Sequence, residues 1–252
     1  MNPISILRFD GALVTDIGPK RKQNQDSGLS LPDEGLFMVA DGMGGHRGGE
    51  IASQLCVDAV REVVSAQGPG QESDPILLQS ALQAANGAIF DRASRDPVLQ
   101  GMGTTATILK IKDQIATLIQ VGDSRAYFWN QSGIWQITRD HSYVQEKIRA
   151  GLITREQARH DEMKNIITRS VGYEGTVNGD IYQLEVEAGD GFLLCSDGLS
   201  GPIDDASMFE ILMDGEKRGA PLSETAERLV RAANTRGGDD NVTVILVRAQ
   251  VV

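Results

Sequence analysis

The sequence contains few cysteines, few aromatic residues and no long hydrophobic run. Its two cysteines, Cys56 and Cys195, lie far apart inside apolar patterns, which predicts two buried, reduced thiols rather than a disulfide. No run approaches the roughly 18 apolar residues of a membrane span, and the first residues lack the apolar core of a secretory signal. We therefore expect a cytoplasmic protein that has no membrane partner.

Basic charge is also scarce. Lysine and arginine total 24 against 35 aspartates and glutamates, so the net charge is -11. Such a chain is poorly suited to bind nucleic acid, whose phosphates require a basic surface, but it suits a protein that concentrates metal cations. The 252 residues, 40% of them hydrophobic, contain no repeat and no linker apart from a polar loop at 67–75. We therefore expect one domain over residues 1–252.

The stretch around Asp41 combines three local signals. Apolar residues at 36–40 predict a short buried strand, which ends at Asp41 and a glycine-rich turn, and apolar residues at helical spacing follow up to Val63. Further strands are expected at 12–17, 105–111, 114–121, 125–129, 134–138, 181–186, 192–196 and 241–247, and further helices at 76–92, 208–213 and 222–233. The short turns between 105 and 138 predict an antiparallel meander.

This order of elements predicts an α+β fold. Two packed, mainly antiparallel β-sheets would be flanked by helix pairs in an α-β-β-α sandwich. The segment 141–175 departs from this pattern, because it is polar, more basic than the rest and helical only in part. A capping box begins there at Thr154 and predicts a helix start.

Aspartates recur where predicted strands end or begin. Asp-Gly occurs five times, and the pairs at Asp10, Asp190 and Asp214 are interpreted as ordinary turns. Four other acids flank apolar strands: Asp41, Asp123, Asp197 and Asp240.

Four such acids on one edge of the sandwich would repel one another and raise each other's pKa, and a divalent cation between them removes that cost. Oxygen ligands favour Mg²⁺ or Mn²⁺, whereas three histidines and no cysteine pair at ligand spacing argue against zinc. The pattern alone leaves open whether the acids bind metal or form turns.

Seven short motifs occur in a fixed order along the chain. They are Arg21-Lys22-Gln23-Asn24-Gln25-Asp26, Asp41-Gly42-Met43-Gly44-Gly45-His46, Gly103-Thr104-Thr105-Ala106, Gly122-Asp123-Ser124-Arg125-Ala126-Tyr127, Asp140-His141-Ser142, Ser196-Asp197-Gly198-Leu199 and Asp240-Asn241-Val242-Thr243. With them the chain resembles the metal-dependent serine/threonine protein phosphatases of type 2C, in their compact bacterial form, from about residue 15 to residue 247.

The resemblance implies a binuclear Mn²⁺ or Mg²⁺ site. Asp41 would bridge two ions, with Asp197 and Asp240 as further ligands of the first ion. The carbonyl oxygen of Gly42 would bind the second ion, and Asp26 would hold a metal-bound water. A third, weaker ion is also implied, with Asp123 and Asp197 as its ligands.

The same resemblance implies roles around the metal. Arg21 would clamp the phosphate, although a solvated member of a basic run is the alternative. Family members with Asp-Gly-His-Gly carry a candidate general acid where this chain has Met43, so His46 is the nearest candidate and a metal-bound water its competitor. Segment 141–175 would be the flap beside the active site. Its basic residues Arg149, Arg155, Arg159 and Lys164 could guide acidic phosphoprotein segments or form a plain solvated face, and His160 is expected at the surface.

The implied function is hydrolysis of phosphoserine and phosphothreonine in proteins by a metal-activated water, opposing a bacterial Ser/Thr kinase, in a monomer. Three alternatives stay open. The glycines at 42, 44 and 48 could belong to a dinucleotide loop of an oxidoreductase. The chain could be a non-catalytic relative that binds phosphoproteins, or a phosphatase with a single phosphoserine regulator as its substrate.

Overall fold

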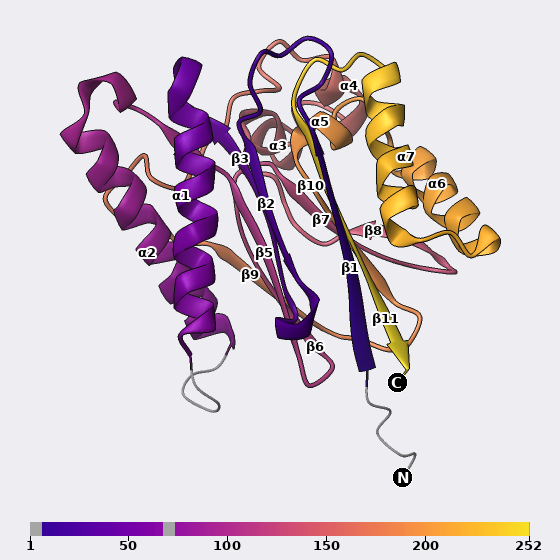
Figure 1. The fold of residues 1–252 in the computed structure, drawn as a ribbon. Helices are drawn as coiled ribbons and strands as arrows, with labels where there is room; N and C mark the ends of the chain where they lie inside the picture. The colour runs from indigo at the N-terminus through magenta and orange to yellow at the C-terminus, as the bar shows by residue number, and fades with distance from the viewer. Residues whose placement is uncertain (1–6, 68–73, 252) are drawn as a thin grey trace.

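The computed structural model describes residues 7–67 and 74–251, apart from the side chains of residues 45–47. Two β-sheets pack face to face between two helix pairs (Figure 1). The pair α1 (Gly45–Ser65) and α2 (Asp74–Arg95) covers one sheet, and α6 (Asp205–Arg218) and α7 (Leu222–Thr235) cover the other. The predicted α-β-β-α sandwich is confirmed.

The two sheets are antiparallel in every pairing that the structure describes. The sheet under α1 and α2 has the order β2 (Asp26–Leu31), β3 (Leu36–Met43), β5 (Ala106–Lys112), β6 (Ile115–Val121), β9 (Asp180–Glu185), and β4 (Gly103–Thr104) pairs with β3. The sheet under α6 and α7 has the order β1 (Leu7–Asp16), β11 (Val242–Val251), β10 (Gly191–Cys195), β7 (Arg125–Asn130), β8 (Gly133–Gln136). Because a dinucleotide-binding fold requires a parallel sheet, the oxidoreductase alternative is wrong.

The remaining elements are short. They are the 3₁₀ helices η1 (Pro32–Glu34) and η2 (Pro97–Leu99), and the α-helices α3 (Tyr143–Arg149), α4 (Arg155–Arg159) and α5 (Asp197–Ser200). The capping box at the start of α4 is formed as predicted, because Thr154 and Gln157 each bond the other's backbone N–H. No described helix is long and apolar enough to span a membrane.

The central strands are buried on both faces. In β3, Met38 faces the helix pair α1–α2, whereas Phe37 faces the second sheet. In β10, Leu193 faces α6 and α7, whereas Phe192 lies between the sheets. Strands covered on both sides are apolar almost throughout, which is why these segments appear in the sequence as short continuous hydrophobic runs.

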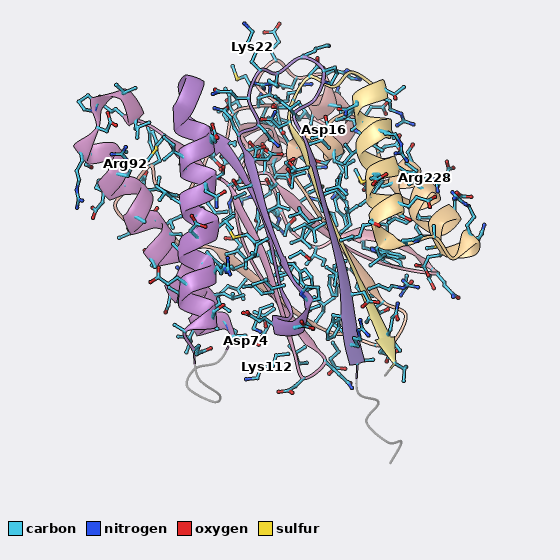
Figure 2. The ribbon with its side chains drawn as sticks, viewed as in Figure 1. Asp16, Lys22, Asp74, Arg92, Lys112 and Arg228 are labelled. Atoms are coloured by element: carbon cyan, nitrogen blue, oxygen red, sulfur yellow. The ribbon has the colours of Figure 1, made fainter. Side chains whose placement is uncertain are left out.

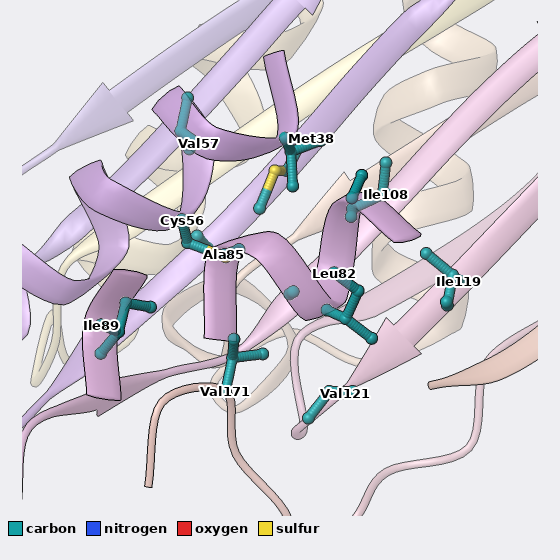
Figure 3. Packing of buried hydrophobic residues seen from close by; sticks show 14 of the residues in the cluster. Met38, Cys56, Val57, Leu82, Ala85, Ile89, Ile108, Ile119, Val121 and Val171 are labelled. Carbon is teal, nitrogen blue, oxygen red and sulfur yellow. The ribbon is translucent and has the colours of Figure 1, made fainter. Parts of the chain in front are cut away.

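Both predicted buried thiols are confirmed as free and fully buried. Cys56 packs in the core beneath α1 and α2, near Met38 and Ala85 (Figure 3). Cys195 lies in the core beneath α6 and α7. Burial raises the pKa of each thiol to about 12, so neither is a thiolate nucleophile at neutral pH.

The predicted meander is wrong at its centre. β5 pairs with β6, and β7 pairs with β8, but the two hairpins belong to different sheets. The chain changes sheets over residues 122–124. Gly122 makes this possible, because it adopts φ +103° and packs directly on Thr105, where a side chain would collide.

Two predicted turns are also wrong. Asp10 and Gly11 lie inside β1 and pair with β11, and the missing side chain of Gly11 leaves room for the ring of Phe37. Asp214 and Gly215 lie inside α6, where Gly215 packs against α7. In both places tertiary packing overrides the turn preference of Asp-Gly. The third pair, at Asp190, follows a turn as predicted.

Strand β2 was not predicted. Its sequence, Asp26 to Leu31, contains two serines and a glycine and has only a weak alternation. Gly28 lies so close to Leu13 of β1 that a side chain would overlap it. The short elements η1, η2, β4 and α5 were not predicted either. The other strands and the helices α1, α2, α6 and α7 lie where they were predicted, with ends that differ by a few residues, as for α6 and β11, which are both longer.

Candidate active site

Four carboxylates meet at the end of the sandwich where both sheets terminate. Asp26 begins β2 and lies opposite Asp41 near the end of β3. Asp197 follows β10, and Asp240 precedes β11, the strand beside β10. Asp16 at the end of β1 and Lys22 in the next loop mark this end in Figure 2, with Asp74 and Lys112 at the other end.

Burial and mutual repulsion disfavour the charged forms of these acids. Burial, with the nearby charges of Asp197 and Asp240, raises the pKa of Asp26 to about 7. Burial and the charge of Asp240 raise the pKa of Asp197 to about 6. Burial, with the charges of Asp26 and Asp197, raises the pKa of Asp41 well above its usual range. A divalent cation among these groups would offset the free-energy cost of holding them in their charged forms.

The fifth predicted acid, Asp123, lies in the segment that changes sheets. It is buried, and burial together with the charge of Asp197 raises its pKa well above the usual range. The change of sheet over residues 122–124 therefore brings Asp123 near Asp197, as a further ion held by both residues would require.

Hydrogen bonds hold parts of the cluster. Asp26 Oδ2 accepts a bond of 2.7 Å from the Ser196 hydroxyl, and Asp240 Oδ2 accepts one of 2.7 Å from Arg21 Nη2. Among the described residues, no three carboxylate, imidazole or thiol side chains are close enough together, as they stand, to hold a metal ion. Two buried oxygens, Oδ1 of Asp26 and Oδ1 of Asp197, have no hydrogen-bond partner there. These unpaired acceptors and the all-oxygen donor set fit the chemistry of Mg²⁺ or Mn²⁺.

The glycine after each of two acids is required by close backbone packing. A Cβ at Gly42 would overlap the carbonyl oxygen of Gly49 at the start of α1. A Cβ at Gly198 would overlap the carbonyl oxygen of Asn241. Both Asp-Gly pairs therefore bring a carboxylate against the backbone of another segment of the site.

Buried hydroxyls of two threonines, which the sequence alone does not identify as site residues, hold the backbone of Asp41. The Asp41 N–H donates to Thr105 Oγ1 at 2.9 Å, and the Thr104 hydroxyl donates to the Asp41 carbonyl at 2.9 Å. Thr105 Oγ1 also lies 2.7 Å from Ser124 Oγ. The motif at 103–106 contained these residues, but only the fold reveals that they contact Asp41.

Asn241 ties together the loop that carries Arg21. Its buried amide donates to the carbonyls of Ile17 and Gln23, and its oxygen accepts from the backbone N–H of Gln25. Arg21 itself is about half exposed, and its Nε donates to the carbonyl of Asp239. The structure thus brings Arg21 into contact with the acid cluster, although its side chain is still exposed to solvent.

The histidines occupy three different environments. His46 lies in the first turn of α1, and its side chain is outside the described residues, so its prediction stays open. His160 is exposed, as predicted. His141 is buried: its Nδ1 accepts from the Gly122 N–H at 3.1 Å, and its Nε2 lies 3.3 Å from Asp180. His141 thereby holds the backbone of Gly122, the residue before Asp123, where the chain changes sheets.

A cleft of about 610 Å³ leads away from the acids, with Asp123 and Asp197 among its lining residues. The edge strand β8 and the helices α3 and α4 of segment 141–175 contribute to its lining. Arg125 lies within it and is held by bonds from Nε and Nη2 to Asp140. Segment 141–175 therefore forms one side of a cleft that reaches the acid cluster.

Comparisons with known proteins show the family of this chain. The family model for protein phosphatase 2C matches residues 20–246. The serine/threonine phosphatase stp of Listeria innocua is 37% identical over 94% of this chain and 95% of its own. The serine/threonine protein phosphatase PstP of Mycobacterium tuberculosis is 38% identical over 96% of this chain and 45% of its own. A crystal structure of the PstP catalytic domain in complex with two manganese ions superposes with a TM-score of 0.87 at 35% identity, covering 97% of this chain and 100% of that one.

Proposed function

This chain belongs to the protein phosphatase 2C family and is a serine/threonine protein phosphatase, and we propose that it hydrolyses phosphoserine and phosphothreonine monoesters at a centre of two Mn²⁺ or Mg²⁺ ions. The observation that carries this proposal is the buried cluster of carboxylates with raised pKa values and unpaired oxygens. The two manganese ions in the related PstP catalytic domain support it.

In this proposal Asp41 would be shared by the two ions, Asp197 and Asp240 would hold the first, and the Gly42 carbonyl would hold the second. The ions would supply a water of lowered pKa and positive charge for the phosphoryl oxygens. Asp26, which begins the strand beside Asp41, would orient a water in the outer shell, and Asp123 with Asp197 would hold a third, weaker ion.

Arg21 is the proposed phosphate ligand. Its guanidinium can donate two parallel hydrogen bonds to phosphoryl oxygens, which a lysine cannot do. Its contact with Asp240 supports this role, because that bond holds the guanidinium at the mouth of the cluster.

The leaving alkoxide needs a proton, and His46 is the proposed donor, with water as the competing one. The pH dependence of kcat/KM in a His46→Ala variant decides between them. Loss of the basic-limb pKa would support His46, whereas an unaltered profile would exclude it as the general acid.

The biological setting is part of the same proposal. Substrates would be phosphoproteins made by a Ser/Thr kinase, and the protein would act as a monomer in the cytoplasm, where two buried, reduced thiols are stable. The non-catalytic alternative is disfavoured, since every predicted metal ligand is present.

The test is phosphate release from a phosphothreonine peptide, measured with Mn²⁺, with Mg²⁺ and with EDTA. We expect activity that depends on the ion and falls by about 10³-fold in Asp197→Ala, a loss of about 4 kcal/mol of transition-state stabilisation. Asp214→Ala is the matched control, because Asp214 lies on the surface of α6 and pairs only with arginines. Full activity in EDTA, or in Asp197→Ala, would contradict the mechanism.

A further inference from the structure

The cleft beside the acid cluster carries the charge opposite to that of the whole protein. Four cations line it beyond Arg125: Arg139, Arg155, Arg159 and Lys164. All four are exposed, and none forms an ion pair within 4.0 Å with a carboxylate in the described part of the chain. In a chain of net charge -11, four unpaired cations in one cleft are a departure that calls for an explanation.

The carboxylates in the cleft do not neutralise these cations. Asp140 is occupied by Arg125, with distances of 2.7 to 3.1 Å. Asp123 and Asp197 belong to the acid cluster at the inner end. Asp205 is the one further carboxylate in the lining, and the charges of Asp204 and Asp239, outside the lining, also act on Arg159 and Lys164 without forming an ion pair.

The cations of the flap, residues 141–175, fall into those that form ion pairs and those that do not. Lys147 pairs with Asp161 inside the flap at 2.8 Å, and Arg169 pairs at 2.6 Å with Asp180, the first residue of β9, so both are engaged in structural ion pairs. Arg155 and Arg159 are four residues apart on α4, which places them on one helix face, and that face lines the cleft. Arg149, at the end of α3, is exposed but does not line the cleft.

We infer that this cleft binds an acidic segment of the substrate, on one flank of its phosphorylated residue. The inference rests on the proposed function, because the inner end of the cleft is the proposed metal centre. With a phosphoryl group at Asp197, a chain that continues in one direction enters the cleft and meets the four cations. A chain that continues in the other direction does not enter it.

Charge complementarity of this kind selects substrates by kcat/KM. Exposed cations attract an acidic peptide over several Å and weaken as salt screens them. Apolar lining residues such as Ile134 and the half-exposed Trp135 add contact surface along the β8 side. The cleft therefore favours phosphopeptides with Glu or Asp on one flank, without changing the chemistry at the metal.

The experiment uses the Mn²⁺-loaded protein and four substrates: p-nitrophenyl phosphate, and phosphothreonine peptides with glutamates on the amino-terminal flank, on the carboxy-terminal flank or on neither. We expect one of the two acidic peptides to be preferred by about tenfold at low salt, through KM, with the preference shrinking at high salt. The double variant Arg155→Glu/Arg159→Glu should abolish that preference and leave hydrolysis of p-nitrophenyl phosphate within about twofold.

Arg149→Glu is the matched control, since it reverses one charge on the same flap outside the cleft. Three results would overturn the inference: an equal gain from glutamates on both flanks, an unchanged preference in the double variant, or the same loss in Arg149→Glu. Failure of the proposed function has a different signature, because p-nitrophenyl phosphate would then not be hydrolysed even by the wild type.

Discussion

The two halves of the sandwich each contribute two acids to the site, but they hold them differently. In the half that contains β2 and β3, buried hydroxyls of Thr104 and Thr105 hold the backbone of Asp41. In the half that contains β10 and β11, Asp197 is positioned by backbone packing, with Gly198 against the carbonyl of Asn241. Both halves therefore depend on a glycine packed against a backbone carbonyl, Gly42 and Gly198, and the backbone of Asp41 is held in addition by two threonine hydroxyls.

Few direct bonds join the halves at the site. The Ser196 hydroxyl accepts from the Thr243 N–H within its own half and donates to Asp26 in the other. Asn241 likewise accepts from the backbone of Gln25. Because the acids come from both sheets, the geometry of the proposed metal centre depends on how the two sheets pack on each other as well as on the conformation of each strand. A site of this kind is sensitive to changes that shift either half by a fraction of an ångström.

The largest expected effect comes from adding a methyl group to either half. Gly42→Ala and Gly198→Ala should each destabilise the protein by about 3 kcal/mol, because each Cβ overlaps a backbone carbonyl that cannot move freely. Gly87→Ala is the control: Gly87 lies inside α2 with nothing within 4 Å of its Cβ position, so the variant should be stabilised by about 0.5–1 kcal/mol.

Urea unfolding measures all three glycine variants. If Gly198→Ala were as stable as the wild type, the half with β10 and β11 would not depend on this close packing. If only Gly42→Ala were destabilised, the two halves would differ more than their shared Asp-Gly pattern indicates.

The next effect concerns the acids as a group. Asp26 and Asp197 have pKa values raised from 3.8 to about 7 and about 6, so the metal-free native state binds protons that the unfolded chain has released. The metal-free protein should therefore lose stability as pH rises from about 4 to about 7, with a fall in Tm on the order of 5 °C. Mn²⁺ should raise Tm more at pH 8 than at pH 5.5, since metal competes with those protons.

Scanning calorimetry in EDTA measures this slope. His141 acts in the opposite direction, because burial lowers its pKa and its stabilising effect grows as pH rises. Asp26→Asn isolates the acids and should flatten the fall in Tm. A Tm in EDTA that rises over this range in the wild type, with the same slope in Asp26→Asn, would exclude the buried acids as its cause.

Much of this fold could be predicted from the sequence because its central strands are buried on both faces. Runs such as 36–40 and 192–196 are unambiguous, and each ends at an acid of the site. The pairing of hairpins into sheets could not be predicted, since the change of sheet depends on Gly122 packing against Thr105. For the same reason Asp10-Gly11 was mistaken for a turn: the alternation around it is weak, and only pairing with β11 keeps it extended.

The acids of the site could be predicted because each lies beside a strand or in a recognisable motif. The residues that hold these acids in place could not be predicted, because Thr105, Ser196 and Asn241 act through contacts between segments far apart in the chain. A hydroxyl or amide carries no periodic pattern that distinguishes a buried support from a surface residue. The cations of the cleft show the same limit, since Arg149 and Arg155 look alike in sequence and only the fold separates them.

The smallest expected effect distinguishes the two ways of holding an acid. Thr105→Val removes the acceptor of the Asp41 N–H and the hydrogen-bond partner of Ser124. It should lower the stability by about 1–2 kcal/mol and weaken Mn²⁺ binding by about tenfold. Thr105→Ser keeps the hydroxyl and should retain both the stability and the binding. Thr107→Val is the matched control. It removes a buried bond to the Ser124 carbonyl, without a contact to Asp41, and should cost stability alone.

Isothermal titration with Mn²⁺ separates support of the metal ligand from support of the fold. Thr105→Val should change the dissociation constant, because a displaced Asp41 backbone moves two of the proposed metal ligands, the Asp41 carboxylate and the Gly42 carbonyl, together. Equal dissociation constants in Thr105→Val and Thr107→Val would mean that the Thr105 hydroxyl stabilises the fold without positioning Asp41. The two halves would then hold their acids in the same way, through the close packing of Gly42 and Gly198.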